Sequence, residues 1–243
     1  MTKGAIYYTD SELDPVIMKA CQKQLKNAFG GEIISVSLKP MDFGENIVLK
    51  QKGKILKRSY PTMVKQILTA LEVSSADVVF FSEHDVLYHP SHFDFTPDRN
   101  DTFYYNTNDW RWDYPHDRAI TYDNLTSLSM LCCNRALALK HYRTRLDTII
   151  MKKLDEHEGR EPDWARRWGY EPGTKRTKRG GFSNDKSEYW KSKYPNIDIR
   201  HSKTFSRRKV HLDDFKHAPN EETWREVKLD EILGWQNVKE LFK

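Results

Sequence analysis

Two carboxylates separated by one residue, Glu83 and Asp85, directly follow a nearly all-apolar run at positions 77–81. Such a run is typical of a buried strand in a parallel sheet, so both acids would lie where that strand ends. One or two carboxylates suit Mg²⁺ or Mn²⁺, because the ion keeps coordination sites for phosphate oxygens and water. The pattern predicts a cation site for a diphosphate leaving group, on which the ion would act as a Lewis acid. The alternative is a solvated strand end that happens to carry two acids.

The elements that would position these acids alternate along the first hundred residues. Strand-like runs at 5–9, 32–38 and 77–81 are separated by helical spacing at 15–29 and from Ser59 through Leu71, where Pro61 falls in the first turn. Strand, helix, strand, helix, strand indicates right-handed crossovers and a largely parallel α/β sheet. Ligands of such sheets bind beyond the carboxyl ends of the strands. Thr9-Asp10 and the segment 82–85 stand at those ends.

The second half of the sequence is less regular. We expect strands at 103–112 and 127–133, a long helix at about 135–156, and a Pro/Gly/basic segment at 161–181. A helix at 184–191, a short strand at 197–199 and a closing amphipathic helix at 223–242 would follow.

Composition restricts the class of protein. The chain has 243 residues, a net charge of +5, no apolar run long enough to span a membrane and no signal-like N-terminus. Its three cysteines, Cys21, Cys132 and Cys133, form neither a disulfide framework nor a zinc pattern, so we expect a cytoplasmic protein with the adjacent pair buried. Basic runs at 175–179 and 207–209 are either solvated loops or contacts for a phosphate-bearing partner.

The segment Phe80 to Tyr88 resembles the Asp-x-Asp segment of GT-A glycosyltransferases, with Glu83 in place of the first Asp. The stretch 57–60 is similar to the start of the helix that precedes this segment in family-2-like enzymes. The similarity covers most of the first 135 residues. It implies a GT-A (Rossmann-like) fold, with a mixed, mostly parallel sheet flanked by helices, in a single domain 1–243. Within it, 1–100 would bind the nucleotide sugar, 101–222 would form the irregular acceptor side, and 223–243 would close the fold.

The resemblance also implies roles for the motif residues. Asp85 would bind Mn²⁺ or Mg²⁺, and Glu83 would contact the ribose or a metal-bound water. GT-A enzymes often supply a late histidine as a further ligand, and His201, after the short strand 197–199 and Arg200, stands where it would fall. The other donor-site residues would be Tyr8, Thr9 and Asp10 at the nucleoside, Arg58 and Ser59 near the base or diphosphate, and His84 beside them. His89 and His92 are interpreted as loop or core residues, and the alternative is a histidine-rich metal site that includes them and His84.

An inverting transferase needs a carboxylate base to take the proton of the acceptor hydroxyl. Glu171 is the first choice, because it stands in a Gly/Pro-bounded aromatic loop where partial burial would raise its pKa. Asp163 and Glu161 are reserves, and Asp123 is a weaker one. Each of them has the alternative of a loop carboxylate paired with an arginine.

Flat aromatic rings mixed with amides and acids at 104–112 suit a sugar or a nucleobase, and the alternative is that they are core aromatics of a strand. In the first case Asp109 and Trp110 are candidate sugar or acceptor contacts. The donor would be a nucleoside diphosphate sugar such as UDP-glucose. The acceptor would be a cell-surface glycan or a hydroxymethylated pyrimidine in DNA of the bacteriophage type, which the basic loop 175–179 favours. The rivals are a metal-dependent nuclease or hydrolase and a non-catalytic nucleic-acid-binding protein.

Overall fold

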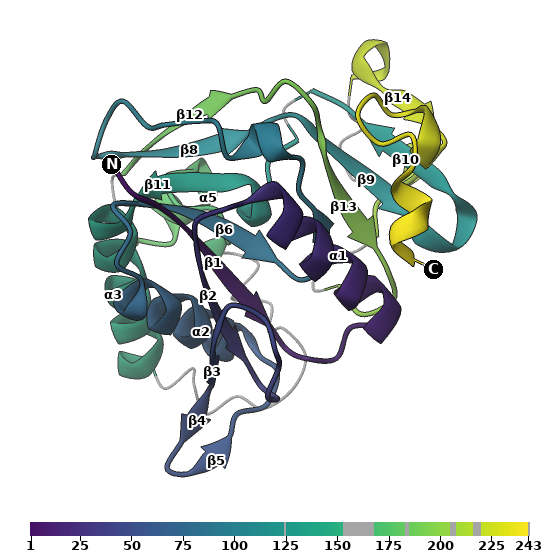
Figure 1. Cartoon of the computed structure of the whole chain (residues 1–243). Coiled ribbons are helices and arrows are strands. Elements are labelled where there is room, and N and C mark those ends of the chain that lie inside the picture. The colour runs from purple at the N-terminus through teal and green to yellow at the C-terminus, as the bar shows by residue number, and fades with distance from the viewer. Residues whose placement is uncertain (124, 153–167, 183–184, 205–207, 216–219, 243) are drawn as a thin grey trace.

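The computed structural model describes the chain except for residues 124, 153–167, 183–184, 205–207, 216–219 and 243. A seven-stranded sheet forms its centre, in the order β12-β8-β11-β6-β1-β2-β3. Neighbouring strands are parallel except at β11, which is antiparallel to both β6 and β8. The predicted α/β class, with a mostly parallel sheet flanked by helices, is confirmed (Figure 1). The strands of this sheet are β1 (Lys3–Thr9), β2 (Glu32–Ser37), β3 (Glu45–Val48), β6 (Val78–Glu83), β8 (Thr102–Asn106), β11 (Leu131–Asn134) and β12 (Lys186–Trp190).

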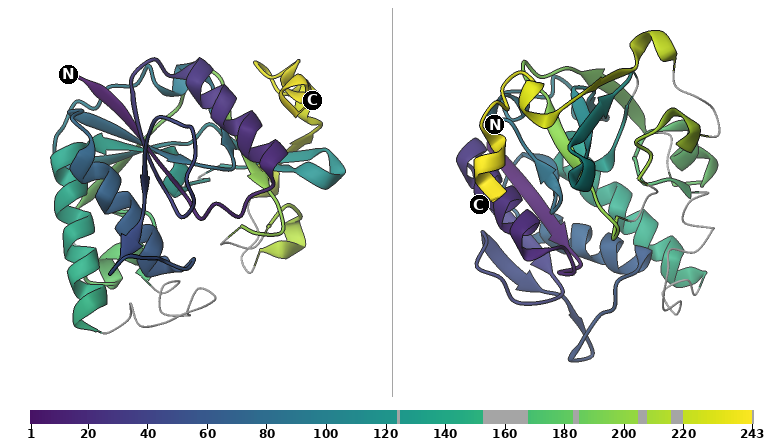
Figure 2. Two further views of the ribbon diagram at one scale, coloured as in Figure 1. Left: turned by 60° about the horizontal axis from the view of Figure 1, so that its bottom comes forward. Right: turned by 90° about the vertical axis from the view of Figure 1, so that its right-hand side faces the viewer.

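Helices cover both faces of this sheet. Side chains alternate along β1, so Ile6 and Tyr8 pack in the cluster that holds α2 (Tyr60–Val73) and α3 (Arg135–Met151). Ala5 and Tyr7 face the opposite way and pack with Leu25 of α1 (Pro15–Ala28). Local signals explain where these helices begin, because Asp14 and Ser59 cap the first turns of α1 and α2 with their side-chain oxygens. Figure 2 shows α1 on one side of the sheet and α2 with α3 on the other.

A second, five-stranded sheet has the order β14-β10-β9-β13-β7. The chain passes from the large sheet into the small one between β6 and β7 and again between β8 and β9. His92, buried at 0% exposure, lies 3.0 Å through Nδ1 from the amides of both Asn106 and Asn196, which places it in the core between these strands. The small sheet consists of β7 (Val86–Leu87), β9 (Asp109–Asp113), β10 (Arg118–Thr121), β13 (Asn196–Arg200) and β14 (Arg225–Val227).

Three predictions of local structure are wrong. Residues 186–190 of the predicted helix 184–191 form a strand instead, because they pair in parallel with β8 as the edge strand β12, where Tyr189 and Trp190 suit a strand. The predicted strand 103–112 is two strands, β8 and β9, in different sheets. The tail is not an amphipathic α-helix: its buried side chains recur at every third residue, the period of short 3₁₀ turns, and Gly234 has φ +92. These side chains are Leu229, Ile232, Trp235 and Val238.

The remaining elements are short. A two-stranded hairpin, β4 (Lys50–Gln51) and β5 (Lys54–Ile55), projects beyond the end of the large sheet in Figure 1. A single helical turn, α5 (Lys175–Arg179), carries the predicted basic run. The predicted long helix ends at Met151, and the rest of its range beyond 152 lies outside the described residues. Among the helices of the described part of the chain, none combines the length and the hydropathy that crossing a bilayer requires.

Candidate functional site

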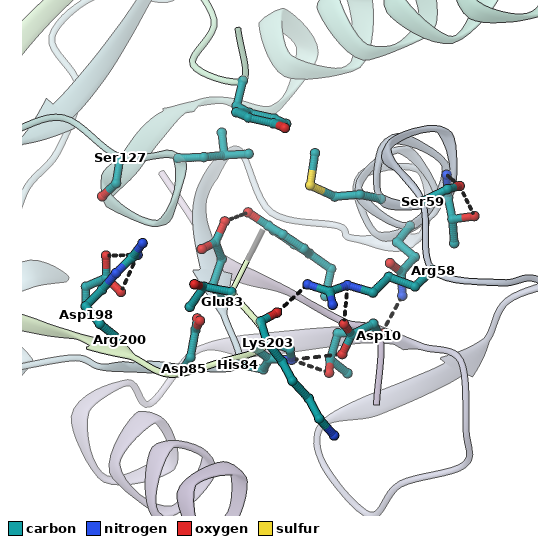
Figure 3. A pocket seen from close by; sticks show the side chains of 18 of the residues that line it. Asp10, Arg58, Ser59, Glu83, His84, Asp85, Ser127, Asp198, Arg200 and Lys203 are labelled. Carbon is teal, nitrogen blue, oxygen red and sulfur yellow. Dashed lines mark hydrogen bonds and ion pairs between the residues drawn. The ribbon is translucent and has the colours of Figure 1, made fainter. Parts of the chain in front are cut away.

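A polar pocket lies where β1 and β6 end and α2 begins, at the carboxyl edge of the parallel strands. Glu83 and Asp85 lie in its middle, with the Asp10–Arg58 ion pair on one side and the Asp198–Arg200 ion pair on the other (Figure 3). The first pair belongs to the large sheet and α2, and the second belongs to β13 of the small sheet. The pocket is therefore built at the junction of the two sheets.

Three potential metal ligands meet in this region. His84, Asp85 and His201 each offer a ligand atom, and these atoms lie within 4.8 Å of one another. Nε2 of His201 is 3.2 Å from Oδ2 of Asp85, although 116 positions separate the two residues. β13 pairs with β7, and this pairing brings the end of the late strand to the β6–β7 turn. The two residues predicted as ligands thus lie together, and His84, which was predicted as a donor-site residue, lies with them.

The donor set fits a divalent transition metal better than Mg²⁺. Two imidazoles and one carboxylate, all from partly or fully buried residues, leave positions open for oxygens of a ligand. Mg²⁺ favours an octahedron of oxygens, whereas imidazole nitrogens suit softer divalent ions, and Mn²⁺ accepts both kinds of ligand.

The two carboxylates of the strand-end motif differ in protonation. Burial raises the pKa of Asp85, but the hydrogen bond from His201 and the charge of His84 together outweigh it, so this pKa lies below its usual value. Burial and the neighbouring Asp85 raise the pKa of Glu83 well above the ordinary range. Tyr8 donates a hydrogen bond to Oε1 of Glu83 at 2.7 Å. Asp85 is therefore the ionised acid of the pair and Glu83 is the protonated one near neutral pH.

The large-sheet side of the pocket holds the residues expected to contact the nucleoside. Nε of Arg58 lies 2.8 Å from Oδ2 of Asp10, and the hydroxyl of Thr9 lies 2.5 Å from Nδ1 of His84. Ser59 accepts a hydrogen bond from the Thr62 amide as the N-cap of α2, so its hydroxyl is already engaged. All these residues, with Tyr8, line the pocket.

The small-sheet side was largely missed from sequence. Arg200 donates from Nη1 to both carboxylate oxygens of Asp198, at 3.2 and 3.0 Å, and both side chains are buried. In the parallel register of β9 and β13, Arg111 stands beside Asp198 and Asp113 beside Arg200, so opposite charges face each other across the strands. The available signal was the alternation of charged and apolar residues at 109–113 and 197–200, which marks a strand with one charged face.

Glu171, the first-choice base, also lines the pocket. Its backbone carbonyl accepts hydrogen bonds from the hydroxyls of Thr174 (2.8 Å) and Thr177 (2.5 Å), which fixes the start of α5 against it. Burial raises the pKa of the Glu171 carboxyl, as expected from its aromatic loop, although the positive charge of Arg176 opposes part of the shift.

Other predicted residues lie elsewhere. Trp110 packs against the hydrophobic cluster of the small sheet, on the face of β9 away from the charged residues. Asp109 is 1% exposed, outside the lining of the pocket, and burial together with Asp198 raises its pKa well above normal. Asp123 is exposed and does not line the pocket. Asp163 and Glu161 lie outside the described residues.

No family model matches the chain, and no curated protein sequence matches it. Solved structures with some likeness include the galactosyltransferase LgtC in complex with donor and acceptor sugar analogues, with a TM-score of 0.47, 10% identity, and coverage of 98% of this chain and 95% of that one. A second is a Drosophila beta-1,4-galactosyltransferase 7 complex with manganese, UDP-Gal and xylobiose. Its TM-score is 0.35 and its identity is 12%, with coverage of 67% of this chain and 65% of that one. The third is the bifunctional IspDF from Campylobacter jejuni, with a TM-score of 0.44, 12% identity, and coverage of 89% of this chain and 54% of that one. The present chain therefore spans about half of that protein.

Proposed function

We propose that this protein is a metal-dependent glycosyltransferase that moves a sugar from a nucleoside diphosphate sugar to an acceptor hydroxyl. The observation that carries the proposal is the cluster of His84, Asp85 and His201, two of which, His84 and Asp85, line a pocket at the carboxyl edge of parallel strands. A diphosphate brings negative charge, and Arg58, Arg200 and Lys203 line the same pocket with positive charge. This combination supports a site for a nucleotide diphosphate.

The residues around the cluster divide the work of binding the donor. Asp85, His201 and His84 would hold Mn²⁺ or Mg²⁺, with Mn²⁺ favoured by the two imidazoles. The bound ion would supply Lewis-acid stabilisation of the departing nucleoside diphosphate. Tyr8, Thr9 and Asp10 would contact the nucleoside, Arg58 and Ser59 the base or diphosphate, and protonated Glu83 would donate a hydrogen bond to a ribose oxygen. UDP-glucose or a similar UDP-sugar is the donor that we propose.

We assign the acceptor side to the small sheet and the Glu171 loop. Glu171 would accept the proton of the attacking hydroxyl, and its raised pKa suits a base that works near neutral pH. This role goes with inversion at the anomeric carbon. The acceptor would be a glycan or a hydroxymethylated pyrimidine of DNA.

The proposal can be tested with a panel of nucleotide sugars. The protein is incubated with UDP-, GDP- and dTDP-sugars in the presence of Mn²⁺, and release of nucleoside diphosphate is measured with and without EDTA. We expect slow, metal-dependent release from one of them. If no sugar nucleotide is turned over or raises Tm, while plasmid DNA in the same buffer is cut, the site belongs to a nuclease and the proposal fails.

A further inference from the structure

The β4–β5 hairpin has no role in the pocket and projects away from the large sheet (Figure 1). Lys50 pairs with Ile55 and Gln51 with Lys54, so the loop between the strands is the two-residue turn Lys52-Gly53. Every residue from 50 to 55 is exposed. The hairpin therefore offers both of its faces to a partner.

The stretch of chain that contains the hairpin carries charge of one sign. No Asp or Glu occurs between positions 46 and 71, a stretch that contains Lys50, Lys52, Lys54, Lys57, Arg58 and Lys65. Lys65 donates to the side-chain oxygen of Gln51 at 3.0 Å, which ties the hairpin to α2. Within the described part of the chain, no ion pair engages Lys50, Lys52 or Lys54. A polyanion would neutralise this charge.

The tip of the hairpin carries a lysine where the backbone does not favour one. Lys52 has φ +50 and Gly53 has φ +77, as a type I′ turn requires at both central positions. Asn, Asp or Gly is preferred at the first of them, because a Cβ in the left-handed region is strained. A lysine with this backbone conformation at an exposed position is consistent with a use for its side chain. Here the side chain places a positive charge at the outermost point of the hairpin.

Two basic segments connect directly to the pocket. Arg58 lines the pocket three residues after the hairpin ends, which limits the separation of the Ile55 and Arg58 Cα atoms to about 11 Å. The exposed cations of α5 begin four residues after Glu171, whose carbonyl is bonded to Thr174 and Thr177. Cationic surface thus adjoins the donor residue Arg58 and the proposed base Glu171.

We propose that the hairpin binds the phosphate backbone of double-stranded DNA and thereby presents the acceptor to the pocket. The major groove of B-form DNA is about 12 Å wide and admits a two-stranded β-ribbon. Binding to an anionic membrane would need a broader apolar face, whereas Ile55 is the large apolar residue that residues 50–55 expose. DNA is thereby chosen as the acceptor of the proposed transferase. Sugar transfer to DNA rests on that proposed function, whereas binding of DNA by the hairpin does not.

Salt-dependent binding of a fluorescent 30-base-pair duplex tests the inference. Anisotropy is measured over a KCl series in EDTA and without sugar nucleotide, so donor chemistry plays no part. The slope of log K against log[KCl] reports the number of phosphates neutralised, and each lost contact reduces it by about one. We expect Lys52→Asn to reduce the slope by about one and Lys52→Asn/Lys54→Ala by about two.

Lys52→Asn separates a binding role from a structural one. Asn suits the left-handed turn better than Lys, so this variant is expected to fold with an unchanged or higher Tm while it loses DNA affinity. The matched control is Lys191→Ala/Lys193→Ala, two exposed lysines that follow β12 at the opposite end of the molecule (Figure 1), and it should keep the wild-type slope.

Three results would overturn the inference: an unchanged slope in the hairpin variants, an equal loss in the control, or binding of vesicles containing phosphatidylserine without binding of the duplex. The proposed function is tested separately. Donor turnover without duplex binding would contradict DNA binding by the hairpin alone. Hairpin-dependent duplex binding without turnover of any nucleotide sugar would contradict the glycosyltransferase activity alone.

Discussion

The two sheets contribute to one pocket in different ways. In the large sheet, β1 and β6 are buried, mainly apolar strands, and their acidic side chains stand at or just beyond the carboxyl ends, at Glu83 and Asp10. In the small sheet, β9 and β13 carry charged residues along their length, with apolar residues at the alternate positions. The large sheet thus contributes the ends of its strands to the pocket, whereas the small sheet contributes the charged face of its strands.

This difference appears in the two ion pairs that flank Asp85. The side chain of Arg58 on the large-sheet side is 32% exposed, whereas that of Arg200 on the small-sheet side is 6% exposed. Water therefore reaches part of the Arg58 side chain, although its Nε and the Asp10 carboxylate are buried, and it is largely excluded from the second pair. The outer pair is therefore suited to exchange partners with a ligand, whereas the inner pair stabilises the wall of the pocket.

The largest expected effect comes from breaking the inner pair. Asp198→Ala removes the carboxylate that accepts both Nη1 hydrogen bonds of the buried Arg200, and we expect a loss of about 3–5 kcal/mol in the free energy of unfolding. Urea denaturation measures it. The double variant Asp198→Ala/Arg200→Met should recover much of that loss, because it replaces the buried charge as well as its carboxylate. A loss below about 1 kcal/mol in the single variant would show that the two pairs are equivalent.

The next largest effect concerns the residue between the two pairs. Asp85→Asn removes the ionised carboxylate of the three-residue cluster, and we expect metal-dependent donor turnover to fall more than about 100-fold, since even outer-shell changes at metal sites cost 10- to 100-fold. Asp94→Asn, which changes an exposed acid in the same way, is the control and should leave turnover intact. Equal turnover in both variants would remove Asp85 from the site.

Glu171→Gln tests the acceptor side. We expect donor binding to persist and transfer to fall about 100-fold, the lower end of the range for a general base. In the wild type, transfer should rise with pH through a pKa above the ordinary 4.5, because burial favours the protonated acid. A pH–rate profile shared by wild type and variant would contradict this role.

The same shift of pKa has a consequence for stability. The folded state binds the Glu171 proton more tightly than the unfolded chain, so this group stabilises the fold below its unfolded pKa and loses that contribution as pH rises through the folded pKa. Urea denaturation of the wild type and Glu171→Gln over a pH series that begins below the ordinary 4.5 should show the smaller dependence on pH in the variant.

The smallest effect is expected at the outer pair. Because Arg58 is partly exposed, Arg58→Ala should lower the free energy of unfolding by about 1 kcal/mol or less. Its main effect should be a raised KM for the sugar nucleotide. A destabilisation as large as that of Asp198→Ala would mean that both pairs are structural.

The large-sheet half of the fold was accessible from sequence because each of its signals is local. Asp14 and Ser59 cap their helices, the apolar run 77–81 is a buried strand, and the acids follow it at once. Parallel strands end at one edge, so Thr9, Asp10 and Asp85 come together without any long-range information.

The small-sheet half depends on long-range strand pairing that no local sequence pattern predicts. Residues 186–190 carry no strong period, and pairing with β8 makes them a strand. Trp110 seemed suited to a ligand, yet the pleat turns it to the apolar face while Asp109 and Arg111 take the charged one. The proximity of His201 to Asp85 could be expected from the resemblance alone, because it depends on β13 joining β7.

The turn at 84–85 joins the two sheets, since β6 ends at Glu83 and β7 begins at Val86. An ion held by Asp85 and His201 would cross-link this junction to the end of β13, and it would bind the folded chain in preference to the unfolded one. Thermodynamic linkage then makes the cohesion of the two sheets depend on the free concentration of the ion, by RT ln(1 + [ion]/Kd). The proposed metal site would therefore also make the stability of the junction between the two sheets depend on the supply of metal.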